Sequence, residues 1–185
     1  ITIHTSHHTH AVIGSGANDP EKYDPDASRE TLDHSLPYIF AVALEDGIWR
    51  HDASYTPERA HRPETIALWR KIVTAHDDEW ERRYYSMDLT EKAFGGRVDI
   101  TMADGAVISD ALAMANAHPL GAKPFQRPDY IRKFQTLAAD SMSDTAQGEF
   151  LDAVEAMSER APIELNPVVD RVDLATGENG KQGIF

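Results

Sequence analysis

A short polar segment just before an apolar run offers the chain's best candidates for chemistry. Residues 33–38 read Asp-His-Ser-Leu-Pro-Tyr and lead directly into the apolar residues 39–44. Because proline disrupts a helix interior, we predict that the helix either kinks or restarts here, with Ser35 as a natural N-cap and Pro37 in the first turn. The free N–H groups of that turn favour an anion, and the Tyr38 hydroxyl could bind a carboxylate or act as a general acid. The alternative is a capped helix start with Tyr38 packed at its edge.

Four histidines near the amino terminus, His4, His7, His8 and His10, raise the question of metal binding. We predict that residues 1–13, which are rich in Ile, Thr and Val, form a strand with His4, His8 and His10 on one face. Metal sites usually recruit a further ligand, and this run contains no Asp or Glu. A strand that faces solvent or an interface explains the same histidines. We therefore predict no metal.

The main concentration of basic residues comprises Lys123, Arg127, Arg132 and Lys133. Arginine side chains recognise carboxylates well, because the guanidinium fork matches the carboxylate geometry. For Arg132 and Lys133, which lie on a predicted helix, an ordinary solvated face is the alternative. His118 precedes this cluster in a loop, next to a proline.

The composition limits the classes of protein to be considered. A chain of 185 residues that is 41% hydrophobic can bury a core and forms one or two domains. Residues 39–44 are the longest apolar run, far short of a membrane span, and no signal-peptide pattern opens the chain. The absence of cysteine excludes disulfides and thiolate chemistry. The net charge of −13 argues against nucleic-acid binding.

The position of the chain within a whole protein can also be predicted. The chain starts at Ile1, without a methionine and inside the predicted strand, so we expect it to be a piece of a longer protein. The cytoplasm is the default compartment for a cysteine-free chain without a signal pattern.

The predicted elements indicate an α+β fold. After the first strand we expect a loop over residues 14–26 and a helix from Ser28 to Glu45 that ends at Gly47. A short helix from Pro63 should bury Ile66, Trp69, Ile72 and Val73, and a hairpin should pair Val98–Met102 with Val107-Ile108 around Asp104-Gly105. We then expect a helix from Pro128 with Ile131, Phe134 and Leu137 inward. A last helix should start at Asp144 with a capping box to Gln147, and a polar tail should follow Pro162.

Several blocks of the sequence resemble the MmgE/PrpD family. They occur in the family's order and cover nearly the whole chain. The blocks are Thr31–Tyr38 with Ala41, Ala43, Leu44, Asp46 and Gly47, then Phe94–Ile100, Asp104-Gly105, His118–Phe125 and Tyr130–Phe134.

The resemblance implies an enzyme without metal or cofactor that acts on di- or tricarboxylates and dimerises. The blocks are most similar to those of members that remove water from 2-methylcitrate to give 2-methylaconitate in propionate breakdown. Residues 1–122 would form a small, lid-like α+β domain. Residues 123–185 would be helices and a tail that rejoin a large, all-helical domain missing from this chain.

The resemblance also assigns residues to roles. It makes Tyr38 and His34 the catalytic candidates, and Ser35, His118 and Lys123 the substrate-binding candidates. The family's other catalytic residues would lie upstream of Ile1, so we expect the isolated chain to be inactive. Another family reaction, such as cis-aconitate decarboxylation or an epimerisation, and a non-catalytic role in binding or dimerisation are the alternatives.

Overall fold

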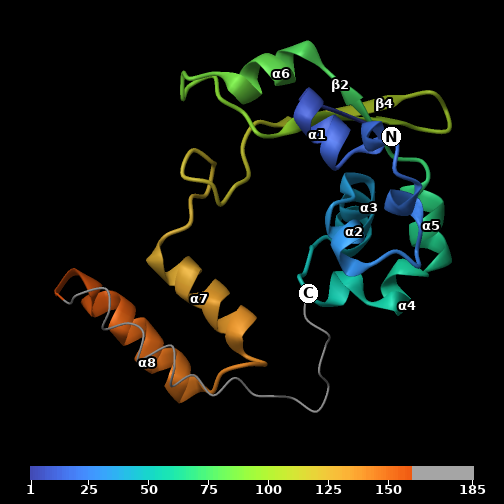
Figure 1. The fold of residues 1–185 in the computed structure, drawn as a ribbon. Coiled ribbons are helices and arrows are strands. Elements are labelled where there is room, and N and C mark those ends of the chain that lie inside the picture. Colours follow the sequence, from blue (N-terminus) through green and yellow to red (C-terminus); the bar gives the residue numbers. More distant parts are fainter. Residues whose placement is uncertain (160–185) are drawn as a thin grey trace. The chain divides into compact units, whose positions relative to one another are not determined.

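The computed structural model describes residues 1–159 and divides the chain into two compact units (Figure 1). The first unit spans residues 1–122, and the second begins at Lys123. Helices and a mixed sheet of four strands make up the described part, so the predicted α+β class is confirmed. None of the helices within residues 1–159 is long and apolar enough to cross a membrane.

The sheet belongs to the first unit and has the strand order β2-β1-β3-β4. Strand β1 runs parallel to β2 and antiparallel to β3, which pairs antiparallel with β4. The bounds are Thr2–Thr5 for β1, Val73–His76 for β2, Gly96–Thr101 for β3 and Val107–Leu112 for β4. The β3–β4 pair confirms the predicted hairpin, and its turn places Gly105 at a φ of +86°, a conformation that favours glycine.

The predicted strand over residues 1–13 is wrong beyond Thr5. Helix α1 (His7–Val12) follows, because the Ser6 side chain caps it by accepting a hydrogen bond from the backbone N–H of Thr9. Residues 6–10 contain no apolar side chain, so they offer a strand no face to bury. His7, His8 and His10 therefore lie on a helix, and only His4 lies on the strand.

Of the two predicted outcomes at Ser35, a kink or a restart, the structure shows the restart, so the helix expected from Ser28 to Glu45 is two helices. Helix α2 (Arg29–Asp33) ends, and helix α3 (Leu36–Asp46) begins with Ser35 as its N-cap and proline in its first turn. Helix α3 ends at Gly47, whose φ of +66° matches the predicted helix stop.

The core of the first unit lies where α3 and helix α5 (Pro63–Trp69) pack below the sheet in the view of Figure 1. Its apolar members are Ile3, Leu32, Tyr38, Ala41, Val42, Tyr55, Ala60, Trp69 and Ile72. Val73, which we expected in this core, instead begins β2 and is exposed.

Short helical segments complete the first unit. The predicted loop over residues 14–26 contains two of them, η1 (Ser15–Ala17) and η2 (Pro20–Tyr23). The others are η3 (Ala53–Tyr55), α4 (Pro57–Ala60) and α6 (Asp78–Tyr85). Helix α6 was not predicted, because its residues are mostly charged and only Trp80 is buried.

The described part of the second unit consists of α7 (Arg127–Ala138), α8 (Asp144–Glu155) and η4 (Ala156–Glu159). Phe134 stacks on Phe150 across the two helices, with ring centroids 5.1 Å apart. The capping box predicted at Asp144 is wrong, because the Ser143 side chain caps α8. Leu137 was predicted to point inward and is exposed. The predicted tail after Pro162 lies outside the described residues.

Candidate functional site

The α2–α3 corner, which we define as residues 33–38, is held together by Ser35. Its hydroxyl donates to the backbone carbonyl of Lys22 at 2.7 Å and accepts the backbone N–H of Tyr38 at 3.3 Å. The backbone N–H of Leu36 donates to the carbonyl of Ile13 at 2.8 Å. Ser35 is fully buried, so its visible role is to fix the start of α3. Its predicted role in substrate binding stays a prediction.

Tyr38 points into the core from the first turn of α3. It is fully buried, its hydroxyl donates to the carbonyl of Ser54 at 2.6 Å, and its ring meets the edge of Trp69 at a centroid distance of 4.8 Å. Burial raises the pKa of the Tyr38 phenol above its ordinary value, so the group stays protonated over the neutral range. These contacts are those of a structural residue, and its catalytic role stays a prediction.

His34 lies on the exposed side of the same corner. Its Nδ1 is 2.9 Å from the carbonyl oxygen of Glu30, and because a carbonyl only accepts, Nδ1 is assigned the proton. The neutral ring then keeps a free lone pair on Nε2. His34 is therefore the predicted catalytic residue that can meet a ligand without any change in the corner.

Lys22 is a buried cation at this corner that sequence reasoning missed. Only 6% of the residue is exposed, and its ammonium donates to the carbonyl of His34 at 2.8 Å. It lies 3.9 Å from the Asp19 carboxylate, which is itself partly exposed. Its charge is thus met largely by protein groups. The N–H groups predicted to be free at the start of α3 are taken as well, by the carbonyl of Ile13 and the hydroxyl of Ser35, so that prediction is wrong. No signal in the sequence marks Lys22, since it lies in a polar run predicted as a loop.

A second tyrosine fixes the neighbouring segment η3. The Tyr55 hydroxyl donates to the Asp33 carboxylate at 2.7 Å and accepts the indole N–H of Trp49 at 2.9 Å. Burial, reinforced by the hydrogen bond to Asp33, raises the Tyr55 pKa well above its ordinary value. Since η3 also carries the Ser54 carbonyl, this bond holds in place the acceptor of Tyr38.

His118 has no hydrogen bond or ion pair with the corner among the described residues of the first unit. His118 accepts the backbone N–H of Leu120 at 3.0 Å, and its ring lies 5.9 Å from that of Phe94. These contacts organise a turn of the loop after β4. Lys123 is exposed and is the first residue of the second unit. The predicted substrate-binding roles of both stay predictions.

The amino-terminal histidines do not share the face that the strand prediction gave them. His4 on β1 lies 3.0 Å from the Asp99 carboxylate, whereas His10 on α1 lies 2.6 Å from the Thr74 hydroxyl. Within residues 1–159, no group of three or more His, Asp or Glu side chains could hold a metal ion. His4, His8 and His10 do not lie on one face, as predicted, because the chain changes from strand to helix at Ser6.

We predict that His10 makes the protein less stable in mild acid. Burial, with His7 and His76 nearby, lowers the pKa of His10 below its ordinary value of about 6.5. The unfolded chain then binds the proton more readily, so the free energy of unfolding falls as the pH drops through about 6.5. Urea unfolding across this range should show a weaker pH dependence for His10→Gln than for the original chain.

His61→Gln is the matched control for this prediction. A hydrogen bond to the carbonyl of Pro57, together with Asp26, raises the pKa of His61. His61 therefore stabilises the fold below its ordinary pKa, and this contribution fades as the pH rises through the folded-state pKa. Its removal should steepen the loss of stability in acid, and a shift of the same sign in both variants would contradict the argument.

Comparison with known families gives a match over the whole described part of the chain. Residues 1–159 match the family model of the MmgE/PrpD C-terminal domain. The match includes the α2–α3 corner, the hairpin and the loop that carries His118, together with α7 and α8.

Proposed function

Because the chain belongs to the MmgE/PrpD family, we propose that it is the carboxyl-terminal part of a 2-methylcitrate dehydratase. The family includes enzymes of this kind, and the match over residues 1–159 is the observation that carries the proposal. The reaction would remove water from 2-methylcitrate to give 2-methylaconitate. This choice of substrate rests on the resemblance of the sequence blocks to those of the family's 2-methylcitrate dehydratases.

The proposed elimination places three demands on the protein. A base must take the C–H proton beside a carboxylate, an acid must protonate the departing hydroxyl, and donors or cations must bind the carboxylates. The C–H and C–O bonds break, a C=C bond forms, and water leaves. In our proposal this chain supplies the acid and part of the carboxylate binding, and the base comes from a helical domain outside the chain.

The α2–α3 corner supports the binding part of the proposal. His34 is exposed and offers its imidazole to a substrate carboxylate. Lys22 and the first N–H groups of α3 already donate to protein acceptors, so in this proposal they reach the substrate only when the corner opens. We propose His118 and Lys123 as further contacts to the substrate.

The acid in this proposal is Tyr38. Burial keeps the phenol protonated, so it holds a proton to give, but the raised pKa also makes that proton harder to release. Because the hydroxyl is buried and bonded to the Ser54 carbonyl, the proposal requires η3 to move away from Tyr38 when substrate binds. His34 would then help to orient the substrate at the opened corner.

The assembly in the proposal is a cytoplasmic homodimer in which this chain and the helical domain form one active site. An active site shared between two domains explains why polar groups gather at one exposed corner of the small unit. A chain without its helical domain would then bind carboxylates weakly and catalyse nothing.

The test is an assay of the complete protein that contains this chain. The complete protein should convert 2-methylcitrate to the unsaturated acid, and chromatography of the products measures this conversion. The 185-residue chain alone should not catalyse it. Release of carbon dioxide from cis-aconitate, or epimerisation without loss of water, would replace the proposed reaction by another of the family. Absence of all three activities in the complete protein would leave a binding or dimerisation domain.

A further inference from the structure

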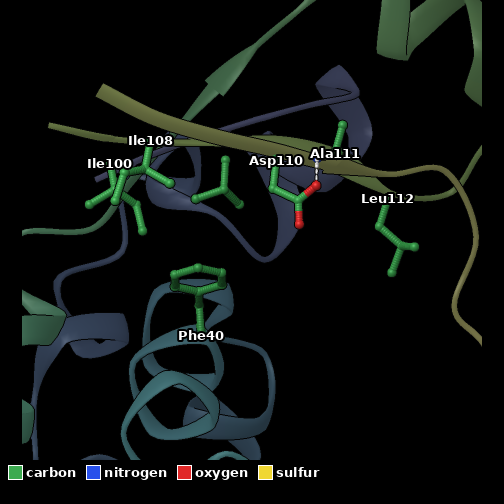
Figure 2. Close-up of a pocket in the computed structure, with 8 residues that line it drawn as sticks. Phe40, Ile100, Ile108, Asp110, Ala111 and Leu112 are labelled. Atoms are coloured by element: carbon green, nitrogen blue, oxygen red, sulfur yellow. Dashed lines mark hydrogen bonds between the residues drawn. The ribbon is translucent and has the colours of Figure 1, made fainter. Parts of the chain in front are cut away.

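An apolar groove lies between the β3–β4 hairpin and helix α3 (Figure 2). It has a volume of about 330 Å³. Phe40 lines one side, and the facing side chains of the hairpin line the other; these are Val98, Ile100, Ile108, Asp110 and Leu112. Ile108 and Leu112 are more than half exposed, at 56% and 54%. The groove is thus an open apolar surface that the first unit does not fill itself.

The groove runs along an unpaired edge of the sheet. Strand β4 is last in the strand order and pairs only with β3 among residues 1–159. An edge strand presents unpaired backbone N–H and C=O groups, which can accept another strand. The edge therefore offers backbone hydrogen bonds, except at the N–H of Ala111, which already donates to the Asp110 side chain. The groove offers apolar contacts to the same occupant.

Asp110 is the charged residue of the groove. Its side chain points from β4 toward the side on which Phe40 lies, between those of Ile108 and Leu112 (Figure 2). It accepts the backbone N–H of Ala111 at 2.8 Å, and it has no ion pair with a basic residue within residues 1–159. A cation opposite Asp110 would therefore complement the groove.

The same carboxylate disfavours a second copy of the chain as the occupant. In a symmetric antiparallel pair, Ile108 of one copy meets Leu112 of the other only if the twofold axis passes through Asp110. The two carboxylates then lie directly opposite each other, which is destabilising. Moving the axis to a neighbouring residue instead pairs each carboxylate with Ile108 or Leu112.

We propose that β4 and the groove bind an extended segment of a partner protein that adds antiparallel to β4. The segment carries a lysine or arginine between two apolar residues at alternating positions. The apolar side chains lie in the groove opposite Ile108 and Leu112, and the basic side chain pairs with Asp110. The net charge of −13 also favours a basic partner. This proposal does not depend on the dehydratase reaction.

A labelled peptide with the sequence Thr-Ile-Thr-Lys-Thr-Val-Thr tests the proposal against the full 185-residue chain. Fluorescence anisotropy should show saturable binding, and replacement of the peptide's lysine by glutamate should weaken it by about fivefold or more. Asp110→Lys should reverse this preference, so that the glutamate peptide binds more tightly than the lysine peptide. Binding that ignores both charges would overturn the proposal.

Two neighbouring residues of β4 provide a matched pair of variants. Ile108 lines the groove, whereas Val107 lies on the opposite face of the strand with a similar exposure of 60%. Ile108→Glu should weaken the lysine peptide by about tenfold, and Val107→Glu by less than about twofold. The proposed occupant would be refuted by an equal loss of peptide affinity in the two variants or by the absence of saturable binding. It would also be refuted by a dimer in sedimentation velocity that Ile108→Glu abolishes.

Discussion

Replacing Arg59 with alanine should lower the free energy of unfolding by about 3 kcal/mol. Arg59 is 3% exposed and forms ion pairs with Glu45 at 2.8 Å and Asp46 at 3.0 Å. It also donates to the Thr65 hydroxyl, which in turn donates to Glu45. Its removal would leave two neighbouring carboxylates at the end of α3 without their shared cation, and this is the cause of the expected loss.

Urea unfolding measures this loss, and Arg62→Ala is the matched control. Arg62 approaches the same Asp46 at 3.8 Å, but its side chain is 57% exposed, so its removal should cost less than about 1 kcal/mol. Equal effects of the two substitutions would show that the buried network adds nothing to stability.

The pH dependence gives a second check on the Arg59 network. The hydrogen bond from Arg59 lowers the pKa of Asp46 below its ordinary value. Its contribution to stability is therefore present above the ordinary pKa and is lost as the pH falls through the lowered one. The difference between the original chain and Arg59→Ala should shrink in the same acid range.

The α2–α3 corner could be predicted from the sequence because local rules decide it. Pro37 is tolerated in a first turn but not in a helix interior, and Ser35 is a strong cap. The hairpin was predictable for the same reason, since Asp104-Gly105 between two alternating apolar runs specifies its turn. Each feature depends on residues within a few positions of one another.

Other parts of the fold depend on partners far away along the chain. Strand β2 exists because it pairs with β1, and Val73 lies beside Thr2 in that register. Nothing within residues 63–73 indicates this pairing, so the sequence favoured a buried helical Val73. The boundary at Thr5 was missed because a helix cap at Ser6 outweighs the β-propensity of the flanking residues.

The candidate site could be predicted only in part. The polar segment 33–38 was recognisable from its residue types, but the buried Lys22 beside it was not, nor was the buried Arg59 at the other end of α3. Each of these two side chains bonds to a partner that is distant along the chain. Lys22 and His34 are 12 residues apart in the sequence, and Arg59 and Glu45 are 14 apart. The burial of Tyr38 likewise follows from how α3 packs on Trp69, which no local pattern specifies.

Tyr38→Phe should lower kcat/KM of the complete protein by about 100-fold if the phenol is the acid of the proposed elimination. The substitution keeps the ring and its contact with Trp69 and removes only the hydroxyl. It should also lower the free energy of unfolding by about 1–2 kcal/mol, because the buried Ser54 carbonyl loses its donor. Steady-state kinetics well below the unfolding temperature separate the two effects.

Tyr23→Phe is the matched control for the catalytic effect. Its ring also lies against Trp69, at 6.0 Å, and its hydroxyl also donates to a backbone carbonyl, that of Ile72 at 2.8 Å. It should cost a similar amount of stability but change kcat/KM by less than about threefold. A loss of activity in Tyr38→Phe no larger than in Tyr23→Phe would mean that the Tyr38 hydroxyl serves the corner's structure alone, and the acid would then have to come from another residue.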